Sequence, residues 1–126
     1  MFKNATVVPS FSVNDTQKAK KFYHETLDLN VKEQPEGLEL QIAGGTRVFV
    51  YPKQNHEPAS FTILNFPVNN IDQAVDELKQ RGVRFEHYDS EPIKTDEKGI
   101  CRTEGASIAW FKDPAGNILS VLEEAA

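Results

Sequence analysis

The chain has 126 residues, of which 39% are hydrophobic and 26% are charged, a composition typical of one soluble globular domain and unlike that of a disordered or fibrous protein. Its formal net charge is −5, which argues against nucleic acid or an anionic membrane as a partner, because both attract basic surfaces. A single cysteine, Cys101, excludes an intrachain disulfide. There is neither a bilayer-spanning apolar run nor a signal peptide pattern, so we expect a cytoplasmic protein.

The first half of the chain predicts one helix and four strands. Residues 6–13 alternate apolar with small or polar side chains, as a half-buried strand does. Asn14 and Asp15 can then cap a helix over residues 16–26. Three further strands are predicted, separated by turns that contain glycine. These strands are 29–34, 38–42 and 47–51.

The second half repeats this order. The segment FSVND at residues 11–15 recurs 55 positions later as FPVNN at residues 66–70. A strand is predicted at 61–68 and a helix at 71–81, which Gly82 ends. Three more strands are predicted after it, with a tight turn at 113–117 before the last. These strands are 83–88, 106–111 and 118–122.

Residues 89–105 show no clear periodicity and exceed the usual length of a connection. Such a loop is either a cover over a functional site or a plainly mobile segment. The sequence does not separate these two interpretations.

Each half therefore predicts the order β-α-β-β-β. Because a helix covers only one face of its sheet, the other face needs a partner. We expect an α+β fold of two tandem βαβββ modules, residues 5–53 and 59–124, within a single domain of residues 1–126. The curved mixed sheets would enclose a cleft, with the helices on the outer faces, and that cleft is where function is expected.

Three segments in this order resemble the vicinal oxygen chelate superfamily, which includes glyoxalases, bleomycin-resistance proteins, fosfomycin-resistance thiol transferases and extradiol dioxygenases. They are residues 11–29, residues 66–83 and residues 111–118, the last with the motif FKDPAGNI. The resemblance implies paired βαβββ modules that form an open cleft, and often a homodimer.

In metal-dependent members, the resemblance implies His, Gln and Glu ligands on the first strand of each module and the last strand of the second. Counted from the helix caps and the Asp113–Asn117 turn, these positions fall on Val8, Ile63 and Ser120. Valine and isoleucine cannot ligate a metal, and serine is a poor ligand. We therefore expect no metal and no cofactor.

The remaining reactive side chains give no catalytic assignment. His24, His56 and His87 lack the spacing of a metal site and are interpreted as exposed or structural. No histidine is indicated as a base for Cys101.

Strand alternation indicates which side chains face the cleft. A mostly apolar set with a few hydroxyl and amide groups suits a small-molecule pocket, although the same side chains would also suit a filled core. Glu39 either faces the cleft as a polar anchor or faces water. The predicted cleft residues are Val8, Ser10, Glu39, Tyr51, Ile63, Asn65, Trp110 and Ser120.

The leading functional hypothesis is a binding protein of the glyoxalase/bleomycin-resistance type without the usual metal ligands. It would hold a small, partly apolar organic molecule in an apolar cleft between its modules, as a homodimer. The net charge of −5 favours a cationic drug among such ligands. One alternative is a lyase, isomerase or dioxygenase-type enzyme that uses an unrecognised metal site or the 89–105 loop. Another is a structural or regulatory homodimer with a filled cleft.

Overall fold

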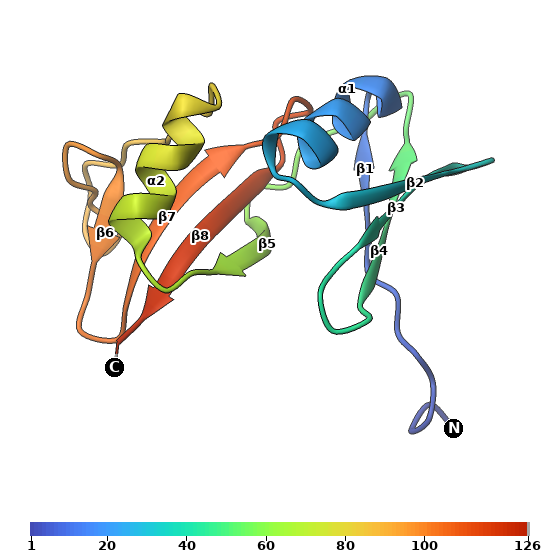
Figure 1. Ribbon diagram of the computed structural model, residues 1–126, viewed down its shortest axis with the longest axis horizontal. Helices are drawn as coiled ribbons and strands as arrows, with labels where there is room; N and C mark the ends of the chain where they lie inside the picture. Colours follow the sequence, from blue (N-terminus) through green and yellow to red (C-terminus); the bar gives the residue numbers. More distant parts are fainter. Residues whose placement is uncertain (126) are drawn as a thin grey trace. The chain divides into compact units, whose positions relative to one another are not determined.

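The computed structural model describes residues 1–125. They form two compact units, which we call unit 1 (residues 1–57) and unit 2 (from Pro58 onward). Each unit holds one four-stranded sheet and one helical segment (Figure 1). The boundary lies in the polar segment that separates the two copies of the sequence repeat.

Unit 1 has strand order β1-β4-β3-β2, with β1 parallel to β4 and the other pairs antiparallel. Its helical part is continuous, because a π-helical turn, η1, follows α1 directly. The elements are β1 (Ser10–Val13), α1 (Thr16–Lys21), η1 (Phe22–Thr26), β2 (Asn30–Gln34), β3 (Gly37–Gln41) and β4 (Arg47–Pro52).

Unit 2 repeats this topology with strand order β5-β8-β7-β6, and β5 is parallel to β8. The predicted α+β fold of two βαβββ modules is thus confirmed. The elements are β5 (Thr62–Pro67), α2 (Ile71–Gln80), β6 (Ile100–Arg102), β7 (Ala106–Lys112) and β8 (Ile118–Glu124).

Both helices begin where the repeat motif predicts. Asp15 accepts hydrogen bonds from the backbone N–H groups of Gln17 and Lys18, at 3.0 and 3.1 Å. Asn70 caps α2 by accepting from the backbone N–H of Gln73 at 3.0 Å. These caps satisfy amides that have no partner inside the helix.

Each helix covers one face of its own sheet and buries that unit's core against it (Figure 1). In unit 1, η1 carries Tyr23, which is 0% exposed and makes an edge-to-face contact with Phe22 at a ring distance of 5.1 Å. The other large core side chains of unit 1 are Val13, Leu38, Leu40 and Val50. Those of unit 2 are Ile71, Val75, Ile100, Phe111 and Leu119.

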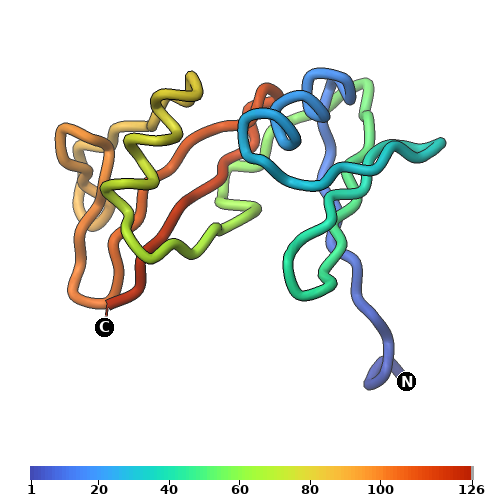
Figure 2. The backbone as a smooth tube through the Cα atoms, in the orientation of Figure 1, coloured from blue at the N-terminus to red at the C-terminus, as the bar shows by residue number. Residues whose placement is uncertain are grey.

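Two predicted strand boundaries were wrong. The strand expected from residue 6 starts at Ser10, and the chain before it runs away from the sheet (Figure 2). The segment 83–88 forms only one bridge, between Phe85 and Phe111. The remaining part of that edge of β7 is occupied by β6, which lies inside the segment expected to be irregular. Three residues are too few to produce a recognisable alternation.

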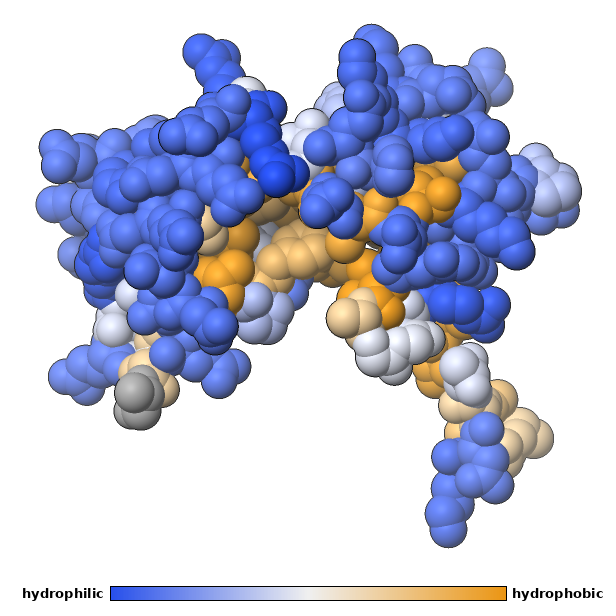
Figure 3. Space-filling model, in the orientation of Figure 1, coloured by the Kyte–Doolittle hydropathy of each residue, from blue (hydrophilic) through white to orange (hydrophobic). Residues whose placement is uncertain are grey.

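Among residues 1–125, no helix is long and apolar enough to cross a membrane. Hydrophilic residues cover most of the face of each unit drawn in Figure 3, with hydrophobic residues visible in patches.

Candidate functional site

Each sheet leaves the face opposite its helix without helical cover, and we call this the helix-free face. In unit 1, Leu38 and Leu40 are buried towards the helix, so Glu39 between them lies on the helix-free face. Because register partners on neighbouring strands lie on the same face, the pairing of the strands identifies the other residues of this face. The helix-free face of unit 1 carries Ser10, Ser12, Asn30, Lys32, Gln34, Glu39, Gln41, Arg47, Phe49 and Tyr51.

In unit 2 the buried residues Ala109 and Phe111 mark the helix side of β7, so Trp110 lies on the other face. The helix-free face here is more apolar than that of unit 1. It carries Asn65, Pro67, Cys101, Ala106, Ile108, Trp110, Lys112, Ile118, Ser120, Leu122 and Glu124.

The eight side chains predicted to line a cleft divide between the two units. Ser10, Glu39 and Tyr51 lie on the helix-free face of unit 1. Val8 precedes β1 and is 40% exposed. In unit 2, Asn65, Trp110 and Ser120 lie on the helix-free face. Ile63 sits at an irregularity where the register of β5 shifts, so it has no register partner on β8.

Glu39 is the centre of a polar cluster on unit 1, and its side chain is only 13% exposed. Its carboxylate accepts hydrogen bonds from Gln41 at 3.1 Å, Gln34 at 3.2 Å and Arg47 at 3.4 Å. The Gln41 hydrogen bond is the main cause of a lowered pKa for Glu39, and the charges of Arg47 and Lys32 lower that pKa further against the opposing effect of burial. Glu39 is therefore an ionised, well-partnered group on this face.

A Ser–His contact lies at the edge of the same face and was missed by sequence reasoning. Ser12 Oγ and His56 Nδ1 are 2.7 Å apart in a hydrogen bond. The two residues are 44 positions apart, and no local motif links them. Tyr51, the register partner of Ser12, stacks on Phe49 with ring centroids 6.1 Å apart. Unit 1 thus combines aromatic surface with closely spaced polar groups.

Three side chains form a row across adjacent strands of unit 2. Ser120 on β8 is the register partner of Asn65 on β5 and of Trp110 on β7. Ser120 is 0% exposed, and its hydroxyl donates a hydrogen bond of 2.6 Å to Asn65 Oδ1. Trp110 is half-buried and meets Tyr88 edge to face at 5.5 Å. This row places an amide, a hydroxyl and an indole together, next to the apolar side chains of Ile118 and Leu122.

The 89–99 segment is held by hydrogen bonds rather than loosely attached. Three hydrogen bonds join Thr95 and Tyr88: the Thr95 backbone N–H and hydroxyl both donate to the Tyr88 carbonyl, and the Tyr88 backbone N–H donates to the Thr95 hydroxyl. Asp96 accepts from the backbone N–H groups of Lys98 and Ile100, both at 2.9 Å. Burial raises the pKa of Asp96, but these hydrogen bonds and Arg102 outweigh that effect and leave the pKa lowered.

Ion pairs tie this segment to α2, on the helix side of the sheet. Lys98 contacts Asp72 and Asp76, each at 3.1 Å, and Arg102 contacts Asp72 at 3.0 Å. The hydrogen bonds from Arg102 and then Lys98 lower the pKa of Asp72. Cys101 lies in β6 rather than in a loop, is buried, and its Sγ is 3.7 Å from the Pro92 carbonyl oxygen.

The residues do not fit the metal site that the fold implies for metal-dependent members. Val8 and Ile63 have no ligating atom, and the Ser120 hydroxyl is already bonded to Asn65. Within residues 1–125, no three His, Cys, Asp or Glu side chains are grouped so that they could hold a metal ion.

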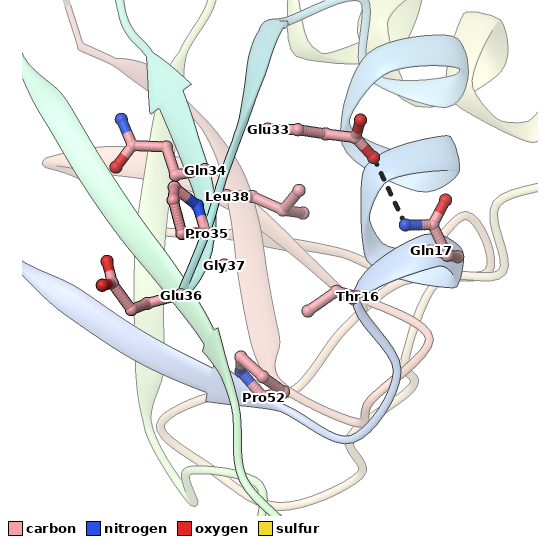
Figure 4. A pocket seen from close by; sticks show the side chains of 9 residues that line it. All are labelled: Thr16, Gln17, Glu33, Gln34, Pro35, Glu36, Gly37, Leu38 and Pro52. Carbon is pink, nitrogen blue, oxygen red and sulfur yellow. Dashed lines mark hydrogen bonds between the residues drawn. The ribbon is translucent and has the colours of Figure 1, made fainter.

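Unit 1 also has a hollow of about 240 Å³ on its helix side, between the start of α1 and the β2–β3 hairpin. Glu33 reaches across it to Gln17, which donates a hydrogen bond of 3.3 Å, whereas Gln34 and Glu36 point away (Figure 4). Glu33 is already bonded to Gln17 and paired with Lys20, and Gln34 is bonded to Glu39, so the hollow is a less promising ligand site than the helix-free faces.

Comparisons with solved structures agree with this fold. An antibiotic binding protein, TnmS3 from Streptomyces sp. CB03234, is 24% identical with a TM-score of 0.67, and the match covers 97% of this chain and 98% of that one. FosX, a fosfomycin resistance protein from Listeria monocytogenes, is 14% identical with a TM-score of 0.69, covering 94% and 92%. A glyoxalase/bleomycin resistance protein/dioxygenase from Alicyclobacillus acidocaldarius is 18% identical with a TM-score of 0.69, covering 98% and 93%.

At these identities the likeness shows the fold alone. No curated protein matches the chain. A family model does, over residues 6–121, and its description is the Glyoxalase/Bleomycin resistance protein/Dioxygenase superfamily. That match takes in both units, both helix caps and the Asp113–Asn117 turn. The chain therefore belongs to the Glyoxalase/Bleomycin resistance protein/Dioxygenase superfamily.

Proposed function

We propose that this protein binds a small, partly apolar organic molecule on its helix-free sheet faces, without the metal site found in metal-dependent members of the superfamily. The observation that carries the proposal is the Asn65–Ser120–Trp110 row on unit 2. A small-molecule site combines apolar area with a few oriented polar groups, and this row has both. The ligand residues proposed are Val8, Ser10, Glu39, Tyr51, Ile63, Asn65, Trp110 and Ser120.

Two further facts support binding without metal chemistry. The positions of the usual ligands carry Val8, Ile63 and a hydrogen-bonded Ser120. One protein of similar fold, TnmS3, is described as an antibiotic binding protein. Sequestration of a drug-like molecule is thus the version of the hypothesis that we favour, in a cytoplasmic protein.

We also propose that the protein is a homodimer. Each sheet has two edge strands that are paired on one side only, β1 and β2 in unit 1 and β5 and β6 in unit 2. Such edges attract a partner strand or need protection. Phe61, next to β5, is 67% exposed. Light scattering should give about twice the mass of 14.2 kDa, and a monomer mass would remove this part of the proposal.

The first test addresses metal. Protein purified without an affinity tag or chelator is assayed for metal content, and its melting temperature is measured with manganese, iron, nickel, cobalt and zinc. We expect no stoichiometric metal and no rise in melting temperature, because a ligand of the native state would raise it. One tightly held metal per chain, with stabilisation that a chelator abolishes, would favour the enzyme alternative.

The second test addresses the ligand. Trp110 is the only tryptophan, so a screen of small aromatic and amphipathic molecules can be read from its fluorescence. For a confirmed ligand, Trp110→Ala should weaken binding about tenfold or more, as loss of an aromatic contact typically does. Lys79→Ala, on the exposed side of α2, is the matched control and should leave affinity unchanged. A screen with no ligand at all would favour the structural homodimer.

A further inference from the structure

The Asn65 side chain has a fixed orientation that determines which ligand group it can bind. Ser120 is fully buried, so its hydroxyl hydrogen needs an acceptor, and Asn65 Oδ1 at 2.6 Å is that acceptor. Turning the amide over would make Asn65 Nδ2 the donor to Ser120 Oγ and leave the buried hydroxyl hydrogen without an acceptor, and 2.6 Å is the length of an O–H···O bond rather than of an N–H···O bond. The structure has no unsatisfied buried side-chain nitrogen or oxygen among the described residues.

The outward group of this pair is therefore the Asn65 amide nitrogen, Nδ2. Asn65 is exposed, and within residues 1–125 its Nδ2 makes no hydrogen bond. An amide nitrogen carries two hydrogens and no lone pair for accepting, so this group can only donate. What it recognises must be an acceptor, such as a carbonyl or carboxylate oxygen.

The spacing of the row adds a second requirement. Asn65 and Trp110 flank Ser120 on the two neighbouring strands, so their backbones are separated by two strand spacings, about 9–10 Å. The small serine between them leaves the indole and the amide as the larger groups of the row. Ile118 and Leu122 lie two residues either side of Ser120 on the same face and are half-buried. An aromatic ring can contact the indole while an attached oxygen reaches the amide.

From these observations, and resting on the proposed function, we infer that the helix-free face of unit 2 binds an aromatic molecule that carries a carbonyl or carboxylate oxygen. The ring packs on Trp110, and the oxygen accepts a hydrogen bond from Asn65 Nδ2. Ser120 acts as a positioning residue, because it affects the ligand only by fixing the orientation of the Asn65 amide.

The test uses two probes of nearly equal shape, 2-acetonaphthone and 2-ethylnaphthalene, which differ by a carbonyl group in place of a methylene group. Binding to the full chain is followed by Trp110 fluorescence and by calorimetry. We expect both probes to change the Trp110 emission, and 2-acetonaphthone to bind about threefold to tenfold more tightly, as one net hydrogen bond predicts.

Four variants test whether the preference for the ketone depends on the Asn65–Ser120–Trp110 row. Asn65→Leu should abolish the preference for the ketone while leaving 2-ethylnaphthalene affinity nearly unchanged. Asn65→Asp should weaken ketone binding further, because a carboxylate offers no donor to the oxygen. Ser120→Ala should reduce the preference without abolishing ring binding, since the amide is then free to turn. Gln73→Leu removes an exposed amide from α2, outside the face, and should leave both affinities unchanged.

The outcomes separate this inference from the proposed function. If both probes quench Trp110 with equal affinity, in the wild type and in Asn65→Leu, the acceptor requirement is wrong while the binding function stands. If neither probe alters Trp110 emission or gives heat, the aromatic site itself is wrong. The proposed function then depends on ligands of other chemistry in the broader screen.

Discussion

The two units share one topology but present different helix-free faces. In both, the first strand is parallel to the fourth, and an Asp or Asn side chain caps the helix. Unit 1 has an ionised cluster around Glu39 on its helix-free face. The corresponding face of unit 2 has Trp110 among isoleucine and leucine side chains. The repeat therefore governs the helix side of each sheet, and the opposite face is free to differ.

The physical reason lies in packing. A side chain under a helix must fill a close-packed space, so a change of even one methylene group there lowers the free energy of unfolding. A side chain on the helix-free face has no helix to fit against, so packing restricts its size and polarity less. The comparison predicts that a substitution on the helix side of a strand will lower stability, whereas a substitution on its helix-free face will mainly change binding.

The largest effect is expected on the helix side of β7. Phe111 is 0% exposed and packs at 5.5 Å from Phe85, so Phe111→Ala should destabilise the protein by about 3–5 kcal/mol. Trp110→Ala, one residue away on the helix-free face, should cost less than about 2 kcal/mol because the indole is only half-buried. Urea unfolding followed by circular dichroism measures both. Equal losses would contradict the division into two faces.

A smaller loss of stability is expected from substitutions in the turns that close the last hairpin of each unit. In unit 2, buried Asp113 accepts from the backbone N–H groups of Ala115 and Asn117, each at 2.9 Å, and from the Asn117 amide at 3.1 Å. Asp113→Ala should therefore cost about 1–3 kcal/mol. The unit 1 turn relies on backbone freedom instead, since Gly45 has φ +84°.

Gly45→Ala tests that second mechanism. The added methyl group meets no atom, so the cost should be only the strain of the left-handed conformation, about 1 kcal/mol. The same urea titrations compare the two turns. A loss for Gly45→Ala that exceeds the loss for Asp113→Ala would show that backbone strain outweighs the buried hydrogen bonds.

The two helix caps should differ slightly. Asp15 accepts from two backbone N–H groups and Asn70 from one. Each alanine substitution should cost about 1 kcal/mol, with Asp15→Ala the more costly, because two amides lose their partner. Asp15→Asn, which keeps a capping oxygen, is the control and should retain most of the stability. Thermal unfolding of the three variants in parallel provides the ranking.

The smallest effect concerns pH. The pKa of Asp72 is lowered from 3.8 by hydrogen bonds from Arg102 and Lys98. The ionised carboxylate is thus favoured in the folded state, and its contribution to stability is complete above pH 3.8 and is lost as the pH falls through the lower folded pKa. Wild type should lose more stability than Asp72→Asn between pH 6 and pH 2 in urea titrations. Added salt should reduce the difference, because these pairs are partly exposed.

Local pattern was sufficient for much of the fold. Residues close together in the sequence are enough to recognise several features. These are each copy of the motif that repeats at an offset of 55, the capping residues Asp15 and Asn70, and the alternation in β3, β7 and β8. Alternation in β1 and β7 places Phe11 and Phe111 on the helix side and Ser10 and Trp110 on the other face. These features depend on backbone geometry that repeats every two or every 3.6 residues, so a single sequence reveals them.

Long-range pairing decided what local pattern could not. β6 exists because Ile100 and Cys101 find Ala109 and Ile108 on β7, whereas residues 83–88 alternate well yet form only one bridge. Ser12 meets His56 across 44 positions, and Ser120 turns the Asn65 amide across 55. Neither contact has a local signature, because hydrogen-bond direction depends on which strands become neighbours. The sequence by itself determined the modules and their faces, and only the tertiary structure decided which donor the candidate site presents.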